Sequence, residues 1–259
     1  MVDEKEQFKA DRNMWGRAHS GWRDPANVLW GVFHTTENSD STPPDNVAQW
    51  QLNTANESSY NVLFGTDGRT VRSNDDDYNP WSTGMPGNRL GFHASAIGYA
   101  SRTREQWLAF PDQIEALAQW AADIHTRYGI PLRWLTVDQV RAQREKGFTD
   151  HATYWQAIGK AKKMDVRTDP GAGFPADVIL TRAGAIARGE VKKDMPKSED
   201  NRLDLALDQL VGHPWNEWAG WPQLAGLSLV DALATVGCKL GIKGFTDKRN
   251  DELRAADPM

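Results

Sequence analysis

One apolar run near the start of the chain is uninterrupted and ends at a histidine. The run extends from Val28 to Phe33, and His34 is followed by the polar residues 35–37. Runs of this length that are rich in valine and aromatic residues are typical of a strand buried on both faces. We therefore expect His34 to be held rigidly where a sheet opens to solvent, which suits a metal ligand or a catalytic group. Taken by itself, a histidine in this position is more often an ordinary residue at a strand end.

Further strands are predicted in the next part of the chain. Residues 59–65 have the pattern of a strand, and the Asp-Gly pair within 66–69 supplies the positive φ that a tight hairpin needs. Residues 70–72 are expected to form the return strand, and 90–100 another buried strand. The long stretch 73–91, rich in Asn, Asp, Pro and Gly, is expected to be a functional or poorly ordered loop.

Several segments between and after these strands are predicted to be helical. Apolar positions at helical spacing predict helices near 45–56, over 103–128 and over 136–146. Residues 147–151 are expected to form a loop, and 167–175 a rigid turn rich in Pro and Gly, with a short helix after it. The mixture of strands and helices predicts an α/β fold, in which a mixed central β-sheet is flanked by helices.

Changes in composition divide the chain into four segments. Residues 1–21 are polar and are expected to form an N-terminal arm, helical or loosely ordered. Residues 22–187 form the α/β domain, and the basic and polar stretch 188–201 is a linker. Residues 202–259, which are rich in tryptophan, are expected to form a small, mainly helical C-terminal segment.

Composition excludes several classes of protein. The formal net charge of the 259-residue chain is −5, which argues against a nucleic-acid partner. No apolar run reaches the length of a membrane span, and residues 1–9 lack the apolar segment of a secretory signal, so neither a membrane anchor nor a signal peptide is expected. One cysteine, Cys238, cannot form an intrachain disulfide or a cysteine-rich zinc site, so any metal must be held by His and carboxylate groups. The 12 tryptophans can pack in a core or stack on sugar rings.

Two further residues can be placed beside His34. His151 follows Gly-Phe-Thr-Asp, and Asp169 begins an Asp-Pro-Gly turn. Two imidazoles and one carboxylate make a three-ligand zinc site with an open fourth position, which is the pattern of a catalytic zinc. The strand end and the restricted turn are the positional support for this set.

Four stretches together resemble one enzyme family. They are Val-Phe-His-Thr-Thr at 32–36, Ser-Tyr-Asn-Val-Leu-Phe-Gly-Thr-Asp-Gly-Arg-Thr-Val at 59–71, Gly-Phe-Thr-Asp-His at 147–151 and Thr-Asp-Pro-Gly-Ala-Gly-Phe-Pro at 168–175. The region of about 22–180 is similar to the zinc-dependent N-acetylmuramoyl-L-alanine amidases of type 2, whose fold is shared with peptidoglycan recognition proteins. Within them it resembles endolysins from phages of mycobacteria and related actinobacteria.

The resemblance implies a set of site residues. It implies zinc on His34, His151 and Asp169, and Tyr60 falls where relatives place a tyrosine near the zinc. Arg167 stands where relatives often carry a lysine; it stays protonated and can stabilise an oxyanion.

A second set of residues is expected to contact the substrate. We assign Trp81, Asn88, His93 and Thr168 to substrate binding, although relatives commonly have Trp-His where this chain has Trp-Ser at 81–82. Glu37 is a candidate base or supporting carboxylate because it is close to the first ligand in sequence; a surface carboxylate is the competing interpretation.

The activity implied by the resemblance is hydrolysis of the amide between the lactyl group of N-acetylmuramic acid and L-alanine. The partner is then bacterial peptidoglycan, and the protein would accumulate in the host cytoplasm until a holin-type pore releases it to lyse the host. Tryptophans of the C-terminal segment could bind wall sugars, cover the α/β domain or form an oligomer contact.

Two alternatives belong to other functional classes. One is a non-catalytic peptidoglycan-binding protein of the same fold, which lacks a metal ligand, and the other is a phage structural or adhesion protein that uses its tryptophan surface. The presence of all three ligand types favours the enzyme, and metal content is the observation that distinguishes the three.

Overall fold

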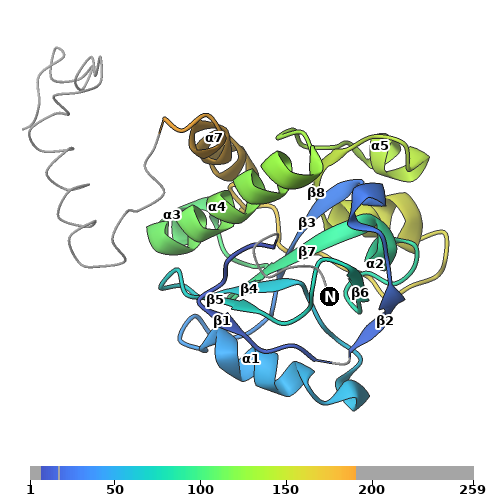
Figure 1. Ribbon diagram of the computed structural model, residues 1–259, viewed down its shortest axis with the longest axis horizontal. Coiled ribbons are helices and arrows are strands. Elements are labelled where there is room, and N and C mark those ends of the chain that lie inside the picture. Colours follow the sequence, from blue (N-terminus) through green and yellow to red (C-terminus); the bar gives the residue numbers. More distant parts are fainter. Residues whose placement is uncertain (1–6, 17, 191–259) are drawn as a thin grey trace, which may run out of the picture. The chain divides into compact units, whose positions relative to one another are not determined.

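The computed structural model describes residues 7–16 and 18–190 (Figure 1). These residues belong to the first of two units into which the chain divides, Met1–Lys193 and Asp194–Met259. Most of the predicted linker and all of the predicted C-terminal segment lie outside the described residues.

A mixed six-stranded sheet forms the centre of the domain, with the strand order β1-β5-β4-β7-β3-β8 (Figure 1). β3 is parallel to both of its neighbours, and β4 is parallel to β7 but antiparallel to β5. The strands are β1 (Arg12–Asn13), β3 (Trp30–Thr35), β4 (Val62–Phe64), β5 (Thr70–Arg72), β7 (Gly91–Ala96) and β8 (Gly147–Asp150), and β2 (His19–Trp22) pairs with β6 (Tyr78–Pro80) separately. The predicted α/β class with a mixed central sheet is confirmed.

The strand predicted from the apolar run is β3, and all six of its residues are buried. It has a parallel partner on each side, so both of its edges are hydrogen-bonded. The predicted hairpin also forms: β4 and β5 pair across a turn in which Gly68 has a φ of 77°. Both elements could be predicted from the local sequence, because a buried strand requires a run of apolar residues and a tight hairpin requires residues such as Asp-Gly at its turn.

The helices begin and end at recognisable residues. Thr103 and Thr136 each form a capping box, with the side chains of Gln106 and Gln139 respectively, and Gly129 ends the longest helix with a φ of 62°. The helices are α1 (Pro44–Gln51), α2 (Gly87–Leu90), α3 (Arg104–Leu108), α4 (Pro111–Tyr128), α5 (Val137–Ala142), α6 (His151–Tyr154) and α7 (Ala176–Ala187), and a π-helical turn, Trp155–Gly159, continues α6.

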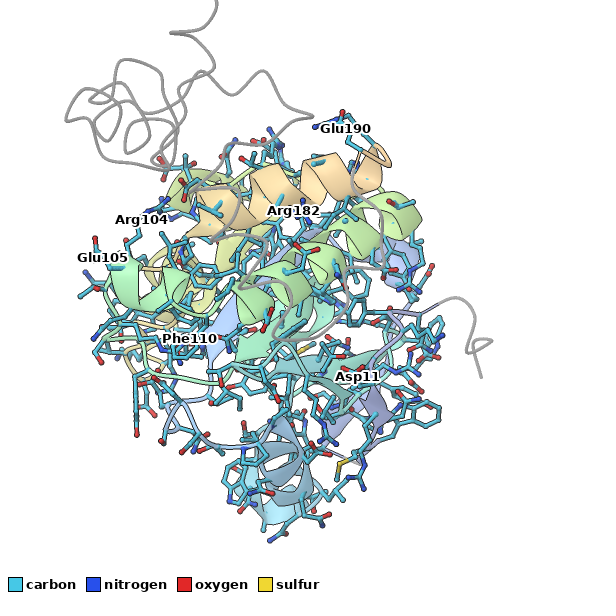
Figure 2. All side chains as sticks on the ribbon, turned by 90° about the vertical axis from the view of Figure 1, so that its left-hand side faces the viewer. Asp11, Arg104, Glu105, Phe110, Arg182 and Glu190 are labelled. Atoms are coloured by element: carbon cyan, nitrogen blue, oxygen red, sulfur yellow. The ribbon has the colours of Figure 1, made fainter. Side chains whose placement is uncertain are left out.

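One face of the sheet packs on α4 and α7. The aromatic rings of Phe33 and Phe148 are buried there against Trp120 of α4, at ring-centroid distances of 5.5 and 6.2 Å. Figure 2 looks onto this helical side, where Arg182 of α7 pairs with Glu115 of α4 at 2.6 Å. This face contains the main hydrophobic core.

The other face carries two smaller apolar clusters with a polar strip between them. Ala48 of α1 packs on Leu63 in one cluster, and Tyr154 of α6 packs on Trp30 in the other. Polar residues His34, His93 and Ser95 lie between the clusters on the same face of β3 and β7, because residues two apart along a strand share a face. All three are completely buried. These three residues form the polar strip, a set of buried polar side chains at the centre of this face of the sheet.

Three sequence-based expectations need correction. The prediction of a loop over 147–151 is wrong, since these residues form β8 and the start of α6. The stretch 73–91 is not one long loop, because it contains β6 and α2. The expected N-terminal arm contributes β1 and β2, which pair with strands of the domain. These strands have between two and four residues and are stabilised by distant partners, so local periodicity did not reveal them.

None of the helices in the described part of the chain has the length and apolar character needed to cross a membrane.

The packing of β3 on β8 predicts the effect of adding one methyl group. A Cβ at Gly31 would lie 2.6 Å from Phe148 Cδ1 and 2.9 Å from Ile124 Cδ1. We expect Gly31→Ala to lower the free energy of unfolding by about 1–3 kcal/mol because the core must open to admit it. Gly184→Ala, inside α7, should instead raise it by about 0.5–1 kcal/mol. Urea denaturation measures both; an unchanged midpoint for Gly31→Ala would contradict the tight packing.

Candidate metal centre

Parallel pairing brings two distant histidines together. In the β3–β8 ladder, Phe33 lies opposite Asp150, so the next residue of each segment, His34 and His151, emerges at the same edge of the sheet. Their ring centroids are 4.8 Å apart. The proximity of the two imidazoles therefore follows from strand register.

The third residue is delivered by the turn that precedes α7. The backbone N–H of Ala152 donates to the carbonyl oxygen of Asp169 at 3.0 Å, which ties the turn to α6. Gly171 has a φ of 93°, and a Cβ there would overlap the carbonyl oxygen of Ala100. The ring of Phe174 packs 5.1 Å from Phe33 in the core. The turn is thus fixed on both sides of the carboxylate.

The three side chains face one another at short distances. His34 Nδ1 lies 3.1 Å from Asp169 Oδ2, and His151 Nδ1 lies 3.2 Å from Asp169 Oδ1. One ligand atom from each residue lies within 4.8 Å of the others, and all three residues are buried. Within residues 7–16 and 18–190, this is the one group of three or more His, Cys, Asp or Glu residues with such geometry.

The donor set fits a zinc ion. Zinc prefers imidazole nitrogen and carboxylate oxygen at about 2.0–2.2 Å, which places tetrahedral donors about 3.4 Å apart. The nitrogen–oxygen distances of 3.1 and 3.2 Å are close to that spacing.

The protonation states are also those that a metal ligand needs. Burial lowers the pKa of His34 to about 4, so the ring is neutral near pH 7. Burial alone would raise the pKa of Asp169, but the imidazoles of His151 and His34, which face its carboxylate, hold that pKa well below its ordinary value. A neutral imidazole facing a carboxylate is a favourable environment for a cation.

Tyr60 lies on the α1 side of this group. Its ring centroid is 5.1 Å from that of His34, and burial raises the pKa of its phenol to about 12, so it remains an O–H donor. Tyr60 lines a cavity of about 400 Å³ together with Trp50 and Gln51, and no charged residue lines this cavity.

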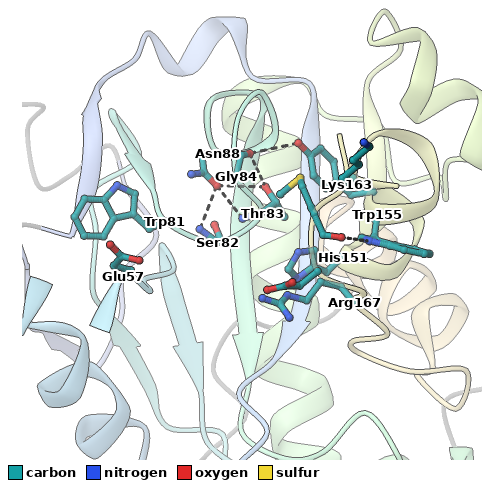
Figure 3. Close-up of a pocket in the computed structure, with 14 residues that line it drawn as sticks. Glu57, Trp81, Ser82, Thr83, Gly84, Asn88, His151, Trp155, Lys163 and Arg167 are labelled. Atoms are coloured by element: carbon teal, nitrogen blue, oxygen red, sulfur yellow. Dashed lines mark hydrogen bonds between the residues drawn. The ribbon is translucent and has the colours of Figure 1, made fainter. Parts of the chain in front are cut away.

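A larger cavity of about 650 Å³ lies on the α6 side, and His151 forms part of its wall (Figure 3). Arg167 and Trp81, which the sequence assigns to catalysis and to substrate binding respectively, also line it. Trp81 lies at one side of the view, and His151 and Arg167 lie at the other (Figure 3). The guanidinium of Arg167 is exposed and donates to the carbonyl oxygen of Val166 at 3.4 Å.

The remaining expected substrate residues occupy different environments. Asn88 lines the larger cavity, but its Oδ1 accepts hydrogen bonds from the backbone N–H groups of Ser82 and Thr83, so it shapes the loop. Thr168 is exposed beside Arg167.

His93 requires a correction, because it does not face the substrate side. Its exposed fraction is zero, and its two ring nitrogens lie within hydrogen-bonding distance of His34 and of the carbonyl oxygen of Gly87. Direct contact with a substrate is excluded by this burial.

Glu37 does not reach the three ligands as a base. Its Oε1 accepts from Thr35 Oγ1 at 2.5 Å and from the backbone N–H of Ala100 at 2.9 Å. The carboxylate therefore holds the end of β3 to the segment that supports the Asp169 turn.

Sequence reasoning missed part of the larger cavity. Trp155, Lys163 and Asp165 line it and come from the stretch whose pattern did not favour helix or loop. The π-helical turn at Trp155–Gly159 interrupts the usual helical spacing, so no periodic signal marked these residues.

Comparison with known proteins places the chain in one class. The profile of the N-acetylmuramoyl-L-alanine amidase family matches residues 24–172, which is more than half of the chain, and the chain belongs to this family. The matched region includes His34, His151 and Asp169. No curated protein sequence matches the chain.

Several solved structures are similar to this chain. The Staphylococcus aureus hydrolase AmiA, crystallised with its ligand, is 16% identical with a TM-score of 0.55, over 71% of this chain and 89% of that chain. An AmpD derivative is 17% identical with a TM-score of 0.46, over 70% and 98% of the two chains. The endolysin LysCS of Clostridium intestinale is 15% identical with a TM-score of 0.41, over 68% and 97%. The likeness to AmiA supports the α/β architecture described above.

The Asp169 turn predicts a difference between two glycine substitutions. Gly171→Ala adds both left-handed strain and an overlap with the backbone of Ala100, so it should cost about 2–5 kcal/mol of unfolding free energy and weaken metal binding. Gly129→Ala, at a φ of 62° with open space around it, should cost only about 1–2 kcal/mol and leave metal binding intact. Thermal unfolding and a chelator competition assay measure the two effects. Equal effects of both variants would contradict the role of the turn.

Proposed function

We propose that this protein is a zinc-dependent N-acetylmuramoyl-L-alanine amidase that hydrolyses the amide between N-acetylmuramic acid and L-alanine in peptidoglycan. The convergence of His34, His151 and Asp169 on one point is the observation that carries the proposal. Family membership supports amidase activity on peptidoglycan, and the ligand geometry supports zinc as the metal.

The three ligands define what a bound ion can contribute. When bound, zinc supplies Lewis acidity toward the scissile carbonyl and makes a water nucleophilic near neutral pH. His34 and His151 bind through neutral imidazoles, and Asp169 provides the one negative charge, so the site keeps a net positive charge that favours a developing oxyanion.

Two other residues act on the reacting groups in this proposal. Tyr60 keeps its phenolic proton because its pKa is raised to about 12, so it can orient the attacking water or the leaving amine by hydrogen bonding. Arg167 remains protonated and can stabilise negative charge on the carbonyl oxygen, although it cannot exchange a proton as a lysine could.

The two cavities suggest how the substrate is divided. The larger one is lined by charged residues, which suits the peptide with its free carboxylates and amine; they are Glu57, Lys163, Asp165 and Arg167. The smaller one is uncharged and includes Trp50 and Gln51, which suits a neutral amino sugar. The ligand group lies between them, since His151 lines the first cavity and Tyr60, beside His34, lines the second.

The biological setting remains part of the proposal. The sequence resemblance supports an endolysin that lyses the host of an actinobacterial phage after release from the host cytoplasm. Wall binding by the C-terminal segment 202–259 is supported by its clustered tryptophans, Trp215, Trp218 and Trp221.

A non-catalytic peptidoglycan-binding protein is the alternative with the same fold. Such a protein lacks a metal ligand, whereas this chain has two histidines and an aspartate in place. The enzyme is therefore the better supported function.

Metal content and product analysis test the enzyme directly. Purified full-length protein should hold about one zinc per chain, and it should release free L-alanine amino termini from peptidoglycan. His34→Ala should lose both the zinc and at least about 10³-fold of the activity. His19→Ala, on β2 and outside the ligand group, is the matched control and should retain both. A protein that binds no zinc and releases no amino termini when zinc is added would overturn the proposal, and release of reducing sugar ends would indicate a glycosidase.

Tyr60 and Arg167 should affect turnover without affecting metal content. Tyr60→Phe and Arg167→Ala each remove a donor aimed at the reacting groups, so kcat should fall by about 10²-fold in each. Arg167→Lys should recover part of the loss because it keeps the charge. Arg141→Ala, which removes an exposed ion pair with Asp138, is the control. Wild-type kcat in both site variants would remove these residues from the mechanism.

A further inference from the structure

His93 belongs to a row of four groups that runs through the polar strip. His93 Nε2 lies 3.2 Å from the carbonyl oxygen of Gly87, and His93 Nδ1 lies 3.1 Å from His34 Nε2. At the other side of the His34 ring, Nδ1 lies 3.1 Å from Asp169 Oδ2. The row therefore contains three contacts, and both of its ends are oxygen atoms.

Counting protons shows that one contact in the row lacks a hydrogen. A carbonyl oxygen and a carboxylate can only accept, so each of the three contacts needs one N–H. Each neutral imidazole has one N–H group. The two imidazoles therefore supply two N–H groups, whereas the three contacts need three. A third would require an imidazolium, and both rings are completely buried, which opposes a positive charge on either of them.

The contact without a hydrogen can be identified. Two buried acceptors can face each other only where a cation lies between them, and the ligand group is at Asp169 and not at Gly87, so the N–H of His93 points to the carbonyl oxygen of Gly87. His93 Nδ1 is then an acceptor, so His34 must donate to it through Nε2–H. The lone pair left over is on His34 Nδ1, facing Asp169 Oδ2, and a cation between these two atoms satisfies both.

We propose that His93 is a positioning residue for the metal centre: its hydrogen bonds hold His34 in the Nε2–H tautomer, so that Nδ1 is the metal-binding atom. This inference rests on the proposed metal site but not on the reaction that the site performs. Metal-ligating histidines commonly donate their second N–H to a carboxylate, a carbonyl or water. Here the acceptor is a second histidine, His93, whose own N–H donates to the carbonyl oxygen of Gly87.

Packing prevents the His93 ring from moving out of the row. A Cβ at Gly91 would lie 2.8 Å from His93 Nε2, so only glycine leaves room for the ring. The backbone N–H of His93 donates to Asn61 Oδ1 at 2.9 Å. Arg23 donates to the carbonyl oxygens of Asn88 and Gly91, which fixes α2 at the start of β7.

Two substitutions of His93 distinguish the effect of its hydrogen bonds from the effect of its side-chain volume. In His93→Gln, the side-chain amide can donate to Gly87 and accept from His34, as the imidazole does. His93→Leu has neither group. In the full-length protein, competition with a chromophoric chelator should show zinc binding about 10–100-fold weaker for His93→Leu, and within about threefold of wild type for His93→Gln. Ser95→Ala, two residues along the same strand face and outside the row, should bind zinc as wild type does.

The tautomer itself gives a measurement that does not need a variant to fold. Long-range ¹H–¹⁵N correlation spectra of the wild-type protein should show His34 and His93 both as Nε2–H tautomers in the zinc-loaded form. An Nδ1–H tautomer of His34, or wild-type zinc affinity in His93→Leu, would overturn the proposal. Zinc binding without hydrolysis would defeat the proposed reaction alone, because the tautomer and the affinity series would still hold.

Discussion

The parallel pairing of β3 with β7 on one side and β8 on the other is the constraint on which the rest of this structure depends. It places His34 and His151 at one edge of the sheet, and it sets His93 beside the first of them. A shift of register by one residue would turn every side chain of β3 to the opposite face. The core rings of Phe33 and Phe148 oppose such a shift, so the hydrophobic face of the sheet determines the geometry of its polar face.

Burial of the polar strip beside the carboxylate of Asp169 lowers the free energy of unfolding wherever a polar atom has no partner. A buried donor or acceptor without a partner costs about 1–3 kcal/mol, and the strip contains two completely buried imidazoles next to a buried carboxylate. Most of their polar atoms are matched within the protein. The one acceptor pair that two neutral rings cannot match lies between His34 and Asp169, where the proposed cation would be held. Folding and metal binding are thus coupled through the same hydrogen-bonded row.

Function follows from how loops are attached to this rigid centre. The Asp169 turn is anchored to α6 and to the segment at Ala100, and the two cavities open on either side of the ligands. The three ligand residues are buried, whereas the walls of the larger cavity include exposed charged side chains and the irregular helical turn at Trp155–Gly159. Substrate selectivity is therefore expected to depend on the cavity walls more than on the metal ligands.

The sequence by itself determined the elements that leave a local pattern: the apolar strand at β3, the Asp-Gly hairpin, the capped helices and the three ligand residue types. It did not reveal that 147–150 is a strand, or that His93 supports His34. A four-residue strand is stable only beside its partner, and the contact between two histidines 59 residues apart exists only once two strands pair. Periodicity records which face a residue takes, but only tertiary pairing decides what lies next to it.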